Sequence, residues 1–335
     1  MMKEILTTRR NFLKTCAAAG SVLAGLPYGS LQADDKATAG AGRGMQISFH
    51  TAAFGSAFWP FEKCLEWAQK NDVHFLECGM IDGVCWVHGL GYMPHLSIND
   101  DPLVFRKKMD QYGCHLSQID AAYPLSGKDG PLYGVPYVLN TLRYAKLIGC
   151  PRVCTTDGLH KPEGLTDAEA MAMMKRSYEL IIERAELYEI DVTIEIHGYF
   201  TTNMNRLDEM LNFVDSPRLQ LNLDTGNAFI AGGNPVDFAT RFAKKTSHLH
   251  IKDVSKELAE KVRGKDTGIA RSHSAVGDGV NAENIRETLK ILHKAGFNGP
   301  LGIECEGQGG PLIEKSLRWL RQTLSELGIP ENKSV

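Results

Sequence analysis

The chain has 335 residues, 43% of them hydrophobic and 23% charged, so it can bury a large core and falls in the ordinary range for soluble proteins. The formal net charge is -3 at pH 7, and the Lys and Arg residues are spread along the chain rather than gathered in blocks. Without a basic surplus, nucleic acid is not expected as a partner. The length allows a single domain of barrel size, and the chain could form a homo-oligomer.

Residues 1–33 predict an export signal. The stretch TRRNFLK at residues 8–14 precedes a weakly apolar run of small residues from Thr15 to Leu26, and this resembles a twin-arginine signal peptide with cleavage near Ala33. An amphipathic helix is the alternative, but two glycines in the run and the proline after it disfavour one. The resemblance implies the twin-arginine translocation machinery as a partner and a periplasmic or otherwise exported location. Because this route carries folded proteins, it suits a cofactor that is loaded before export.

The remainder of the chain alternates between strand and helix patterns after a linker at residues 34–44 that is rich in Ala, Gly and charge. Short apolar runs typical of buried parallel strands cover Gln46–His50, Val73–Cys78, Leu116–Asp120, Arg152–Thr155, Val192–His197, Leu219–Asp224, Ser247–Lys252 and Leu301–Cys305. Helical periodicity covers Pro60–Lys70, Pro102–Tyr112, Pro136–Leu147, Asp167–Tyr188, Asn205–Val214, Pro235–Ala243, Ala282–Ala295 and Leu312–Leu327.

This alternation predicts a (β/α)8 TIM barrel over residues 45–328, with residues 329–335 as a tail. A doubly wound open sheet is the alternative architecture. That architecture more often carries a Gly-rich phosphate loop after the first strand, and the sequence HTAAFG at residues 50–55 does not match one.

The first two strands end in polar residues, His50 and Glu77. The active site of such a barrel lies at the carboxyl ends of the strands, so we expect both side chains at its mouth, in contact with substrate. The following loop, residues 80–95, carries Trp86, whose ring could cover the apolar face of a sugar. Hydrophobic packing of a long loop is the alternative interpretation of these aromatic residues.

The last four strands carry acids and histidines on one face. Since side chains alternate along a strand, one face presents Thr193, Glu195 and His197; Gln220, Asn222 and Asp224; His248, His250 and Lys252; and Gly302, Glu304 and Glu306. For a single Glu or His, a satisfied core residue or a strand-end ion pair would be the simpler interpretation. Four successive strands with the same feature favour a metal site, because burying so many carboxylates without a cation is costly.

Three carboxylates and one imidazole form a mainly oxygen shell, which suits one divalent cation such as Mn, Co or Mg and which Zn also accepts. At these residues the chain resembles the xylose isomerase-like TIM barrels, the sugar phosphate isomerase/epimerase superfamily. The resemblance rests on TIEIH at 193–197, NLDTGN at 222–227, HLHIKD at 248–253, VGDGVN at 276–281 and GFNGPLGIE at 296–304.

The resemblance implies that Glu195, Asp224, His250 and Glu304 are the metal ligands. It also implies that Glu195 and Glu304 exchange protons with the sugar, and that His197 contacts substrate. Lys252 could stabilise an enediolate oxygen, or could instead pair with Asp253.

Two positions depart from the family pattern. Asn227 stands where many relatives carry a substrate-contacting His, and Lys256 stands where many carry Arg. Both changes put epimerase specificity in doubt, although Asn227 can still contact substrate. The inserted loop at residues 255–275, with Arg271 and His273, could supply replacements or could be a surface insertion.

The function that these features predict is a metal-dependent isomerase or epimerase acting on an unphosphorylated keto sugar through an enediolate. Export and the absence of an Arg cluster near the last strands disfavour a sugar phosphate. One alternative is an exported lyase or dehydratase that eliminates from a 3-keto glycoside or keto sugar. A non-catalytic carbohydrate-binding barrel is the alternative from another class, and a DNA-repair endonuclease is disfavoured by the missing basic groove.

Overall fold

The structure, a computed structural model, describes residues 44–55, 60–82, 94–265, 270–307 and 309–334. Gly42–Val335 is one compact unit. The predicted signal peptide, almost all of the predicted linker and the predicted sugar-contacting Trp86 lie outside the described residues.

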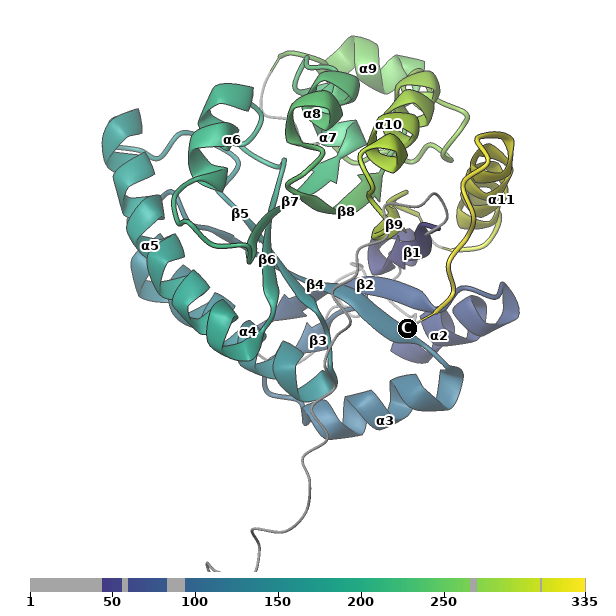
Figure 1. The fold of residues 1–335 in the computed structure, drawn as a ribbon, viewed down its shortest axis with the longest axis horizontal. Helices are drawn as coiled ribbons and strands as arrows, with labels where there is room; N and C mark the ends of the chain where they lie inside the picture. Colours follow the sequence, from purple (N-terminus) through teal and green to yellow (C-terminus); the bar gives the residue numbers. More distant parts are fainter. Residues whose placement is uncertain (1–43, 56–59, 83–93, 266–269, 308, 335) are drawn as a thin grey trace, which may run out of the picture. The chain divides into compact units, whose positions relative to one another are not determined.

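Eight parallel strands form a closed barrel, which confirms the predicted (β/α)8 fold (Figure 1). The strands are β1 (Gln46–His50), β2 (Phe75–Ile81), β4 (His115–Pro124), β5 (Arg152–Thr156), β6 (Asp191–Glu195), β7 (Leu219–Asp224), β8 (Thr246–Ile251) and β9 (Pro300–Ile303). They follow the order β1-β9-β8-β7-β6-β5-β4-β2, and β1 pairs with β2 to close the ring. The short β3 (Leu96–Ser97) pairs with the end of β2.

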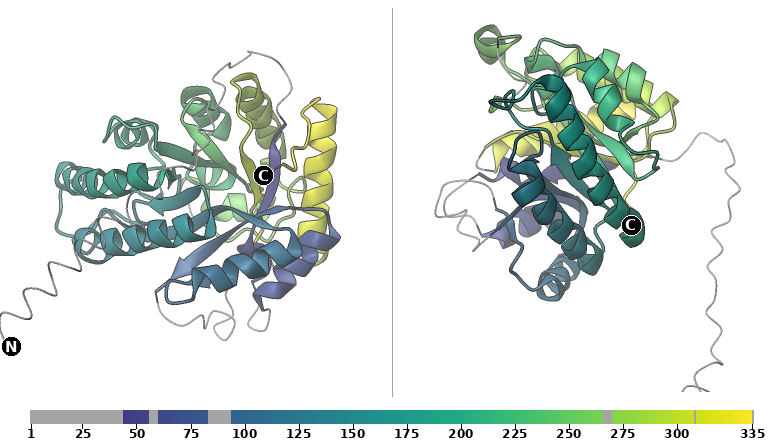
Figure 2. Two further views of the ribbon diagram at one scale, coloured as in Figure 1. Left: turned by 60° about the horizontal axis from the view of Figure 1, so that its bottom comes forward. Right: turned by 90° about the vertical axis from the view of Figure 1, so that its left-hand side faces the viewer.

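Helices lie along the outside of the barrel, and Figure 2 shows α4 and α5, in teal, side by side there. The longer ones are α2 (Phe61–Lys70), α3 (Pro102–Tyr112), α4 (Val135–Ile148), α5 (Asp167–Tyr188), α6 (Met204–Leu211), α8 (Pro235–Phe242), α10 (Ala282–Lys294) and α11 (Pro311–Glu326). The short ones are η1 (Thr51–Ala53), η3 (Gly130–Gly134), α7 (Thr225–Ile230) and α9 (Lys256–Val262). In the part of the chain that the structure describes, no helix is long and apolar enough to cross a membrane.

Local sequence signals explain where the longest helix begins and which strand face it covers. Thr166 caps α5 in a reciprocal capping box with Glu169, so the first backbone N–H groups of the helix are satisfied. On the neighbouring β6, Val192 and Ile194 are completely buried in the hydrophobic core, whereas Glu195 lies on the alternate face, toward the barrel interior. The same alternation places the polar face of the other strands inside the barrel.

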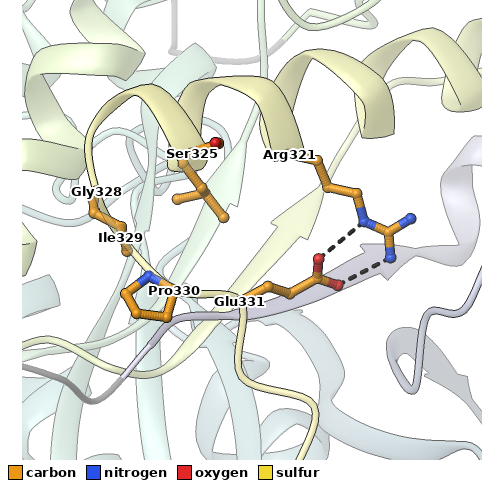
Figure 3. A pocket seen from close by; sticks show the side chains of 7 residues that line it. Arg321, Ser325, Gly328, Ile329, Pro330 and Glu331 are labelled. Carbon is orange, nitrogen blue, oxygen red and sulfur yellow. Dashed lines mark hydrogen bonds and ion pairs between the residues drawn. The ribbon is translucent and has the colours of Figure 1, made fainter.

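The residues predicted as a tail pack against the start of β1, at the end of the barrel opposite the carboxyl ends of the strands. Met45 pairs with Glu331, and Ile329 is buried in the core. A hollow of about 390 Å³ lies here, between α11 and this segment (Figure 3). Arg321 faces Glu331 across it and forms a two-bond ion pair, while its other donors bind backbone carbonyls of Asn71 and Asp72.

Candidate active site

The four predicted metal ligands meet at the mouth of the barrel. The imidazole Nδ1 of His250, on β8, lies 3.2 Å from Glu195 Oε1, 3.2 Å from Glu304 Oε2 and 3.7 Å from Asp224 Oδ2. One ligand atom from each of the four side chains lies within 4.8 Å of the other three. Since these residues end β6, lie in β7 and β8, and directly follow β9, the closed barrel itself brings them together.

The two carboxylate oxygens of Asp224 have different surroundings. Its Oδ1 accepts the backbone N–H groups of Gly226 and Asn227 at 2.7 and 2.8 Å, and so caps α7. Its Oδ2 is buried and has no hydrogen-bond partner among the described residues. The cap therefore holds the carboxylate in place and leaves one oxygen for a ligand.

The two carboxylate oxygens of Glu304 also have different surroundings. Its Oε1 lies 3.4 Å from the ammonium of Lys252, which also lies 3.0 Å from Glu306 Oε1. Its Oε2 is buried without a hydrogen-bond partner in the described part of the chain. The alternative pairing of Lys252 with Asp253 was wrong. The Asp253 carboxylate instead accepts the backbone N–H groups of residues 254, 277, 279 and 281.

The electrostatics of the cluster reflect a surplus of buried carboxylates. Burial and the neighbouring Glu304 raise the pKa of Asp224 to about 7. For Glu304 itself, burial opposes ionisation, but Lys252 and His250 outweigh it and hold the pKa well below its ordinary value. For His250, burial favours the neutral ring, but Glu77 and Glu304 outweigh it and raise the pKa. The site is thus built to hold positive charge.

A divalent cation fits these residues. Two buried carboxylate oxygens lack partners within the described residues, and both point toward the imidazole nitrogen that they share with Glu195. Three carboxylates and one imidazole are a donor set that Mn, Co, Mg and Zn accept.

Of the predicted substrate-contacting residues, His50 lies beside this cluster, and His197 and Asn227 follow the ligands Glu195 and Asp224 by two and three positions. His50 is buried at the end of β1 with its ring centroid 5.9 Å from that of His250, and its Nδ1 accepts the Ala52 N–H, which leaves Nε2 as the protonated nitrogen. His197 follows β6, and its buried Nδ1 has no partner among the described residues. The Asn227 side chain, 1% exposed, likewise has neither amide atom paired in the described part. Buried polar groups without protein partners are typical of ligand sites.

Glu77 does not lie at the open mouth. It is completely buried, its Oε1 accepts from Gln118, and its Oε2 lies 2.7 Å from the Nε2 of His250. Both oxygens are therefore occupied by protein groups, and the contacts give no support to the predicted role in substrate binding.

Asp120 is a residue that sequence reasoning missed. It lies in the middle of β4, where one of its carboxylate oxygens, the thiol of Cys154 and the carboxylate of Glu195 are within 4.8 Å of one another. Burial, together with Glu195 and Glu77, raises the pKa of Asp120 well above its ordinary value. The strand-end argument that singled out Glu195 applies equally to Asp120, which ended a predicted strand.

Glu306, which strand alternation placed on the same face as Glu304 but which was given no role, connects the inserted loop to the site. Its Oε2 accepts the backbone N–H of Ser272 at 2.8 Å, while its Oε1 pairs with Lys252. Ser272 in turn donates its hydroxyl to the backbone carbonyl of Asp253. This part of the insertion is thus attached to the ends of β8 and β9.

Comparisons with known proteins agree with this architecture. The sequence profile of the family described as "Xylose isomerase-like TIM barrel" matches residues 81–323. An inosose dehydratase of Clostridium botulinum is 26% identical over 124 residues, covering 35% of this chain and 41% of the relative. An inosose dehydratase of Geobacillus kaustophilus is 26% identical over 227 residues, covering 62% of this chain and 73% of the relative. In its matches to the first of these curated relatives, the inosose dehydratases of Clostridium, the chain spans only about two fifths of the relatives' length.

Solved structures share the fold. A D-tagatose 3-epimerase-like protein superimposes with a TM-score of 0.67 at 18% identity, covering 85% of this chain and 98% of the other. An IolI protein with a bound zinc atom superimposes with a TM-score of 0.65 at 14% identity, covering 84% and 99%. Given the profile match over most of its length, this chain belongs to the xylose isomerase-like TIM barrel family.

Proposed function

We propose that this protein is a metal-dependent enzyme that removes a proton from the carbon next to the carbonyl of an unphosphorylated keto sugar and returns it, as an isomerase or epimerase. The observation that carries the proposal is the pair of carboxylates, Glu195 and Glu304, each 3.2 Å from the same nitrogen of His250. They come from different strands, so a sugar held between them would meet one carboxylate on each side.

Glu195, Asp224, His250 and Glu304 would hold the cation. When bound, a divalent cation would polarise the substrate carbonyl and stabilise the negative charge that develops on its oxygen. The chain's own contribution is to fix the four side chains, through the α7 cap on Asp224 and the ion pair of Glu304 with Lys252.

The two glutamates would carry the proton. Lys252 and His250 keep Glu304 ionised, so it is able to accept a proton at neutral pH. Glu304 would abstract the proton as a carboxylate, and Glu195, which would enter the step as the carboxylic acid, would deliver its proton to the same or the adjacent carbon; the two glutamates thereby exchange protonation states. His50, His197 and Asn227 would bind the sugar hydroxyl groups, since each has a nitrogen or oxygen that other described side chains leave available.

A lyase or dehydratase is the second candidate, and two observations favour it. The curated relatives at this level of identity are named inosose dehydratases. Asp120 offers a further carboxyl group, outside the four proposed metal ligands, beside Glu195. After the base removes the proton, the electron pair would form a carbon–carbon double bond, and the departing hydroxyl or glycosidic oxygen would take its proton from an acid such as Asp120.

A substrate screen in deuterated water tests both candidates. Free ketoses and 3-keto glycosides would be incubated with the protein and added Mn, Co, Mg or Zn, and the products analysed by mass spectrometry and NMR. An isomerase or epimerase gives a product of equal formula with deuterium at a carbon next to the carbonyl, whereas elimination gives loss of water or of an aglycone. Sugar binding without turnover by any metal-loaded form would overturn catalysis and favour a carbohydrate-binding barrel.

We also propose export by the twin-arginine route, on the grounds of residues 1–33. In an exported enzyme the substrate would be a free or oxidised sugar, because sugar phosphates are metabolites of the cytoplasm.

A further inference from the structure

We propose that Glu77 is the positioning residue of the metal centre, which fixes the ring of His250 so that Nδ1 faces the three carboxylates. The inference rests on the proposed metal site and extends it inward, to residues below the mouth of the barrel. It replaces the role in substrate binding that the sequence suggested for Glu77.

The two nitrogens of His250 face different partners. Nε2 lies 2.7 Å from Glu77 Oε2, a good hydrogen-bond distance. Nδ1 lies 3.2 Å from Glu195 Oε1 and 3.2 Å from Glu304 Oε2. If Nε2 donates its proton to Glu77, the lone pair of Nδ1 is left for a cation, which is the arrangement that a carboxylate behind a metal-bound histidine produces.

Glu77 is itself held from the other side. Its Oε1 accepts from Gln118 Nε2 at 2.8 Å, and Gln118 Oε1 accepts from Thr193 Oγ1 at 2.7 Å. The side chains of Glu77, Gln118 and Thr193 are completely buried. Because the Glu77 carboxylate is an acceptor, the Gln118 amide nitrogen must face it, and the amide oxygen is left to accept from the Thr193 hydroxyl. A chain of bonds across four strands, β6, β4, β2 and β8, thus sets the ring of His250.

The neighbouring His248 does not compete for this carboxylate. Its Nε2 lies 3.6 Å from Glu77 Oε2, beyond hydrogen-bond distance. Its Nδ1 lies 3.1 Å from Asn222 Oδ1. The Asn222 amide nitrogen lies 3.6 Å from Cys154 Sγ, and it lies 3.4 and 3.2 Å from Nδ1 and Nε2 of His250. Because it is nearly equidistant from the two ring nitrogens, it is not aligned with the lone pair of either one. The amide oxygen needs a donor, so the His248 proton sits on Nδ1 and Nε2 has none to give. Glu77 therefore acts on His250 alone.

The charge and geometry of Glu77 both matter in this arrangement. A glutamine at position 77 removes the charge. It can turn its oxygen to His250 without placing its amide N–H against that of Gln118 only if the Gln118 amide also turns over, with the Thr193 hydroxyl then accepting rather than donating. An aspartate keeps the charge but is one methylene shorter, so it no longer reaches Nε2. Both variants should loosen the imidazole ring and lower the affinity for a cation by about 10- to 100-fold.

The experiment compares Zn²⁺ affinity in wild type, Glu77→Gln and Glu77→Asp by competition with a chromophoric chelator. Long-range ¹H–¹⁵N NMR of the histidine rings, with the His250 signals identified by their loss in His250→Asn, reports which ring nitrogen carries the proton. In the zinc-loaded wild type we expect a protonated Nε2, and in both variants weaker binding and altered His250 nitrogen shifts.

The matched control is Asp157→Asn. Asp157 is equally buried and directly follows β5, but it accepts backbone N–H groups of Phe200 and Thr201 and has no contact with His250. Its substitution should lower the melting temperature and leave zinc affinity and the His250 shifts unchanged. If one Glu77 variant fails to fold, as judged by circular dichroism, the other variant decides.

The outcomes separate this inference from the proposed function. A wild-type protein that binds no Zn²⁺ overturns the metal site. A wild type that binds Zn²⁺, with Glu77 variants of equal affinity and unchanged His250 shifts, leaves the metal site standing and overturns the role of Glu77.

Discussion

At the scale of single residues, the site depends on carboxylates in which one oxygen binds a protein group and the other faces His250. Asp224 uses one oxygen to cap a helix, and Glu304 uses one to pair with Lys252. In both, the remaining oxygen is buried beside His250. The fold thereby orients each ligand without relying on the cation.

Substitution of the proposed proton carriers should affect catalysis more than binding. Glu195→Gln and Glu304→Gln should each lower kcat by about 10²- to 10⁴-fold, because glutamine can neither accept a proton from the sugar carbon nor return one. The measurement is steady-state kinetics with the substrate found in the screen, at saturating metal. Glu260→Gln, at an exposed position on α9, should leave kcat unchanged. Wild-type kcat in either active-site variant would rule out that glutamate as a proton carrier.

Lys252 should matter for stability because its charge is buried between two acids. Its side chain is 3% exposed and pairs with Glu304 and Glu306. Lys252→Met removes the ammonium that pairs with Glu306 and one of the two positive groups beside Glu304, so we expect a loss of about 3–5 kcal/mol in the free energy of unfolding of the metal-free protein. Urea denaturation measures it.

A second substitution distinguishes lost charge from lost packing in this variant. Adding Glu306→Gln to Lys252→Met removes the carboxylate left without its ammonium partner, so part of the lost stability should return. A double variant as unstable as the sum of the two single variants would contradict the ion-pair explanation.

At the scale of elements, the loop at residues 276–281 forms hydrogen bonds both to the residue that follows β8 by two positions, Asp253, and to the first residue of α7, Thr225. The Asp253 carboxylate accepts backbone N–H groups of Gly277, Gly279 and Asn281, at 2.9, 2.9 and 3.0 Å. Asn281 then donates to the backbone carbonyl of Thr225 at 2.9 Å. One buried acid therefore supports the helix that carries Asn227.

Removal of that acid should destabilise the loop. Asp253→Ala leaves buried N–H groups without an acceptor, so the free energy of unfolding should fall by at least about 2 kcal/mol. Because α7 would shift, KM should also rise. Asp278→Ala is the matched control in the same loop: its ion pair with Lys315 is exposed, and its loss should cost less than about 1 kcal/mol. Equal losses in thermal or urea unfolding would contradict the role of Asp253.

The sequence pattern predicted the strands and longer helices because their burial follows a regular period. It also predicted which side chains face the mouth, since alternation along a strand gives the parity of Glu195 or His250 directly. The short helices α7 and α9 were missed, because six or seven residues carry too little periodicity. Contacts between distant strands could not be predicted, as the bond between Glu77 and His250 illustrates: 173 positions separate the two residues.

At the scale of the whole molecule, the two ends of the barrel have different roles. The carboxyl ends of the strands hold the polar cluster, and the amino ends are closed by the chain after α11, where Glu331 pairs with Met45 and Arg321. The polar interior continues below the mouth through Gln118 and Thr193. Correct closure of the barrel is therefore a requirement for the site, which favours loading of a metal into an already folded chain.

Export should depend on the arginine pair itself, rather than on positive charge. Arg9→Lys/Arg10→Lys keeps the charge and the apolar run but removes the planar guanidinium groups, which a receptor can bind through two parallel hydrogen bonds. We expect the double variant, expressed in a Gram-negative host, to remain in the cytoplasm with residues 1–33 attached, while Lys14→Arg is exported and cleaved near Ala33. Cell fractionation and mass spectrometry of the N-terminus measure this. Because a route that carries unfolded chains reads charge and apolarity alone, periplasmic recovery of the cleaved double variant would show that the barrel folds and acquires its metal after export.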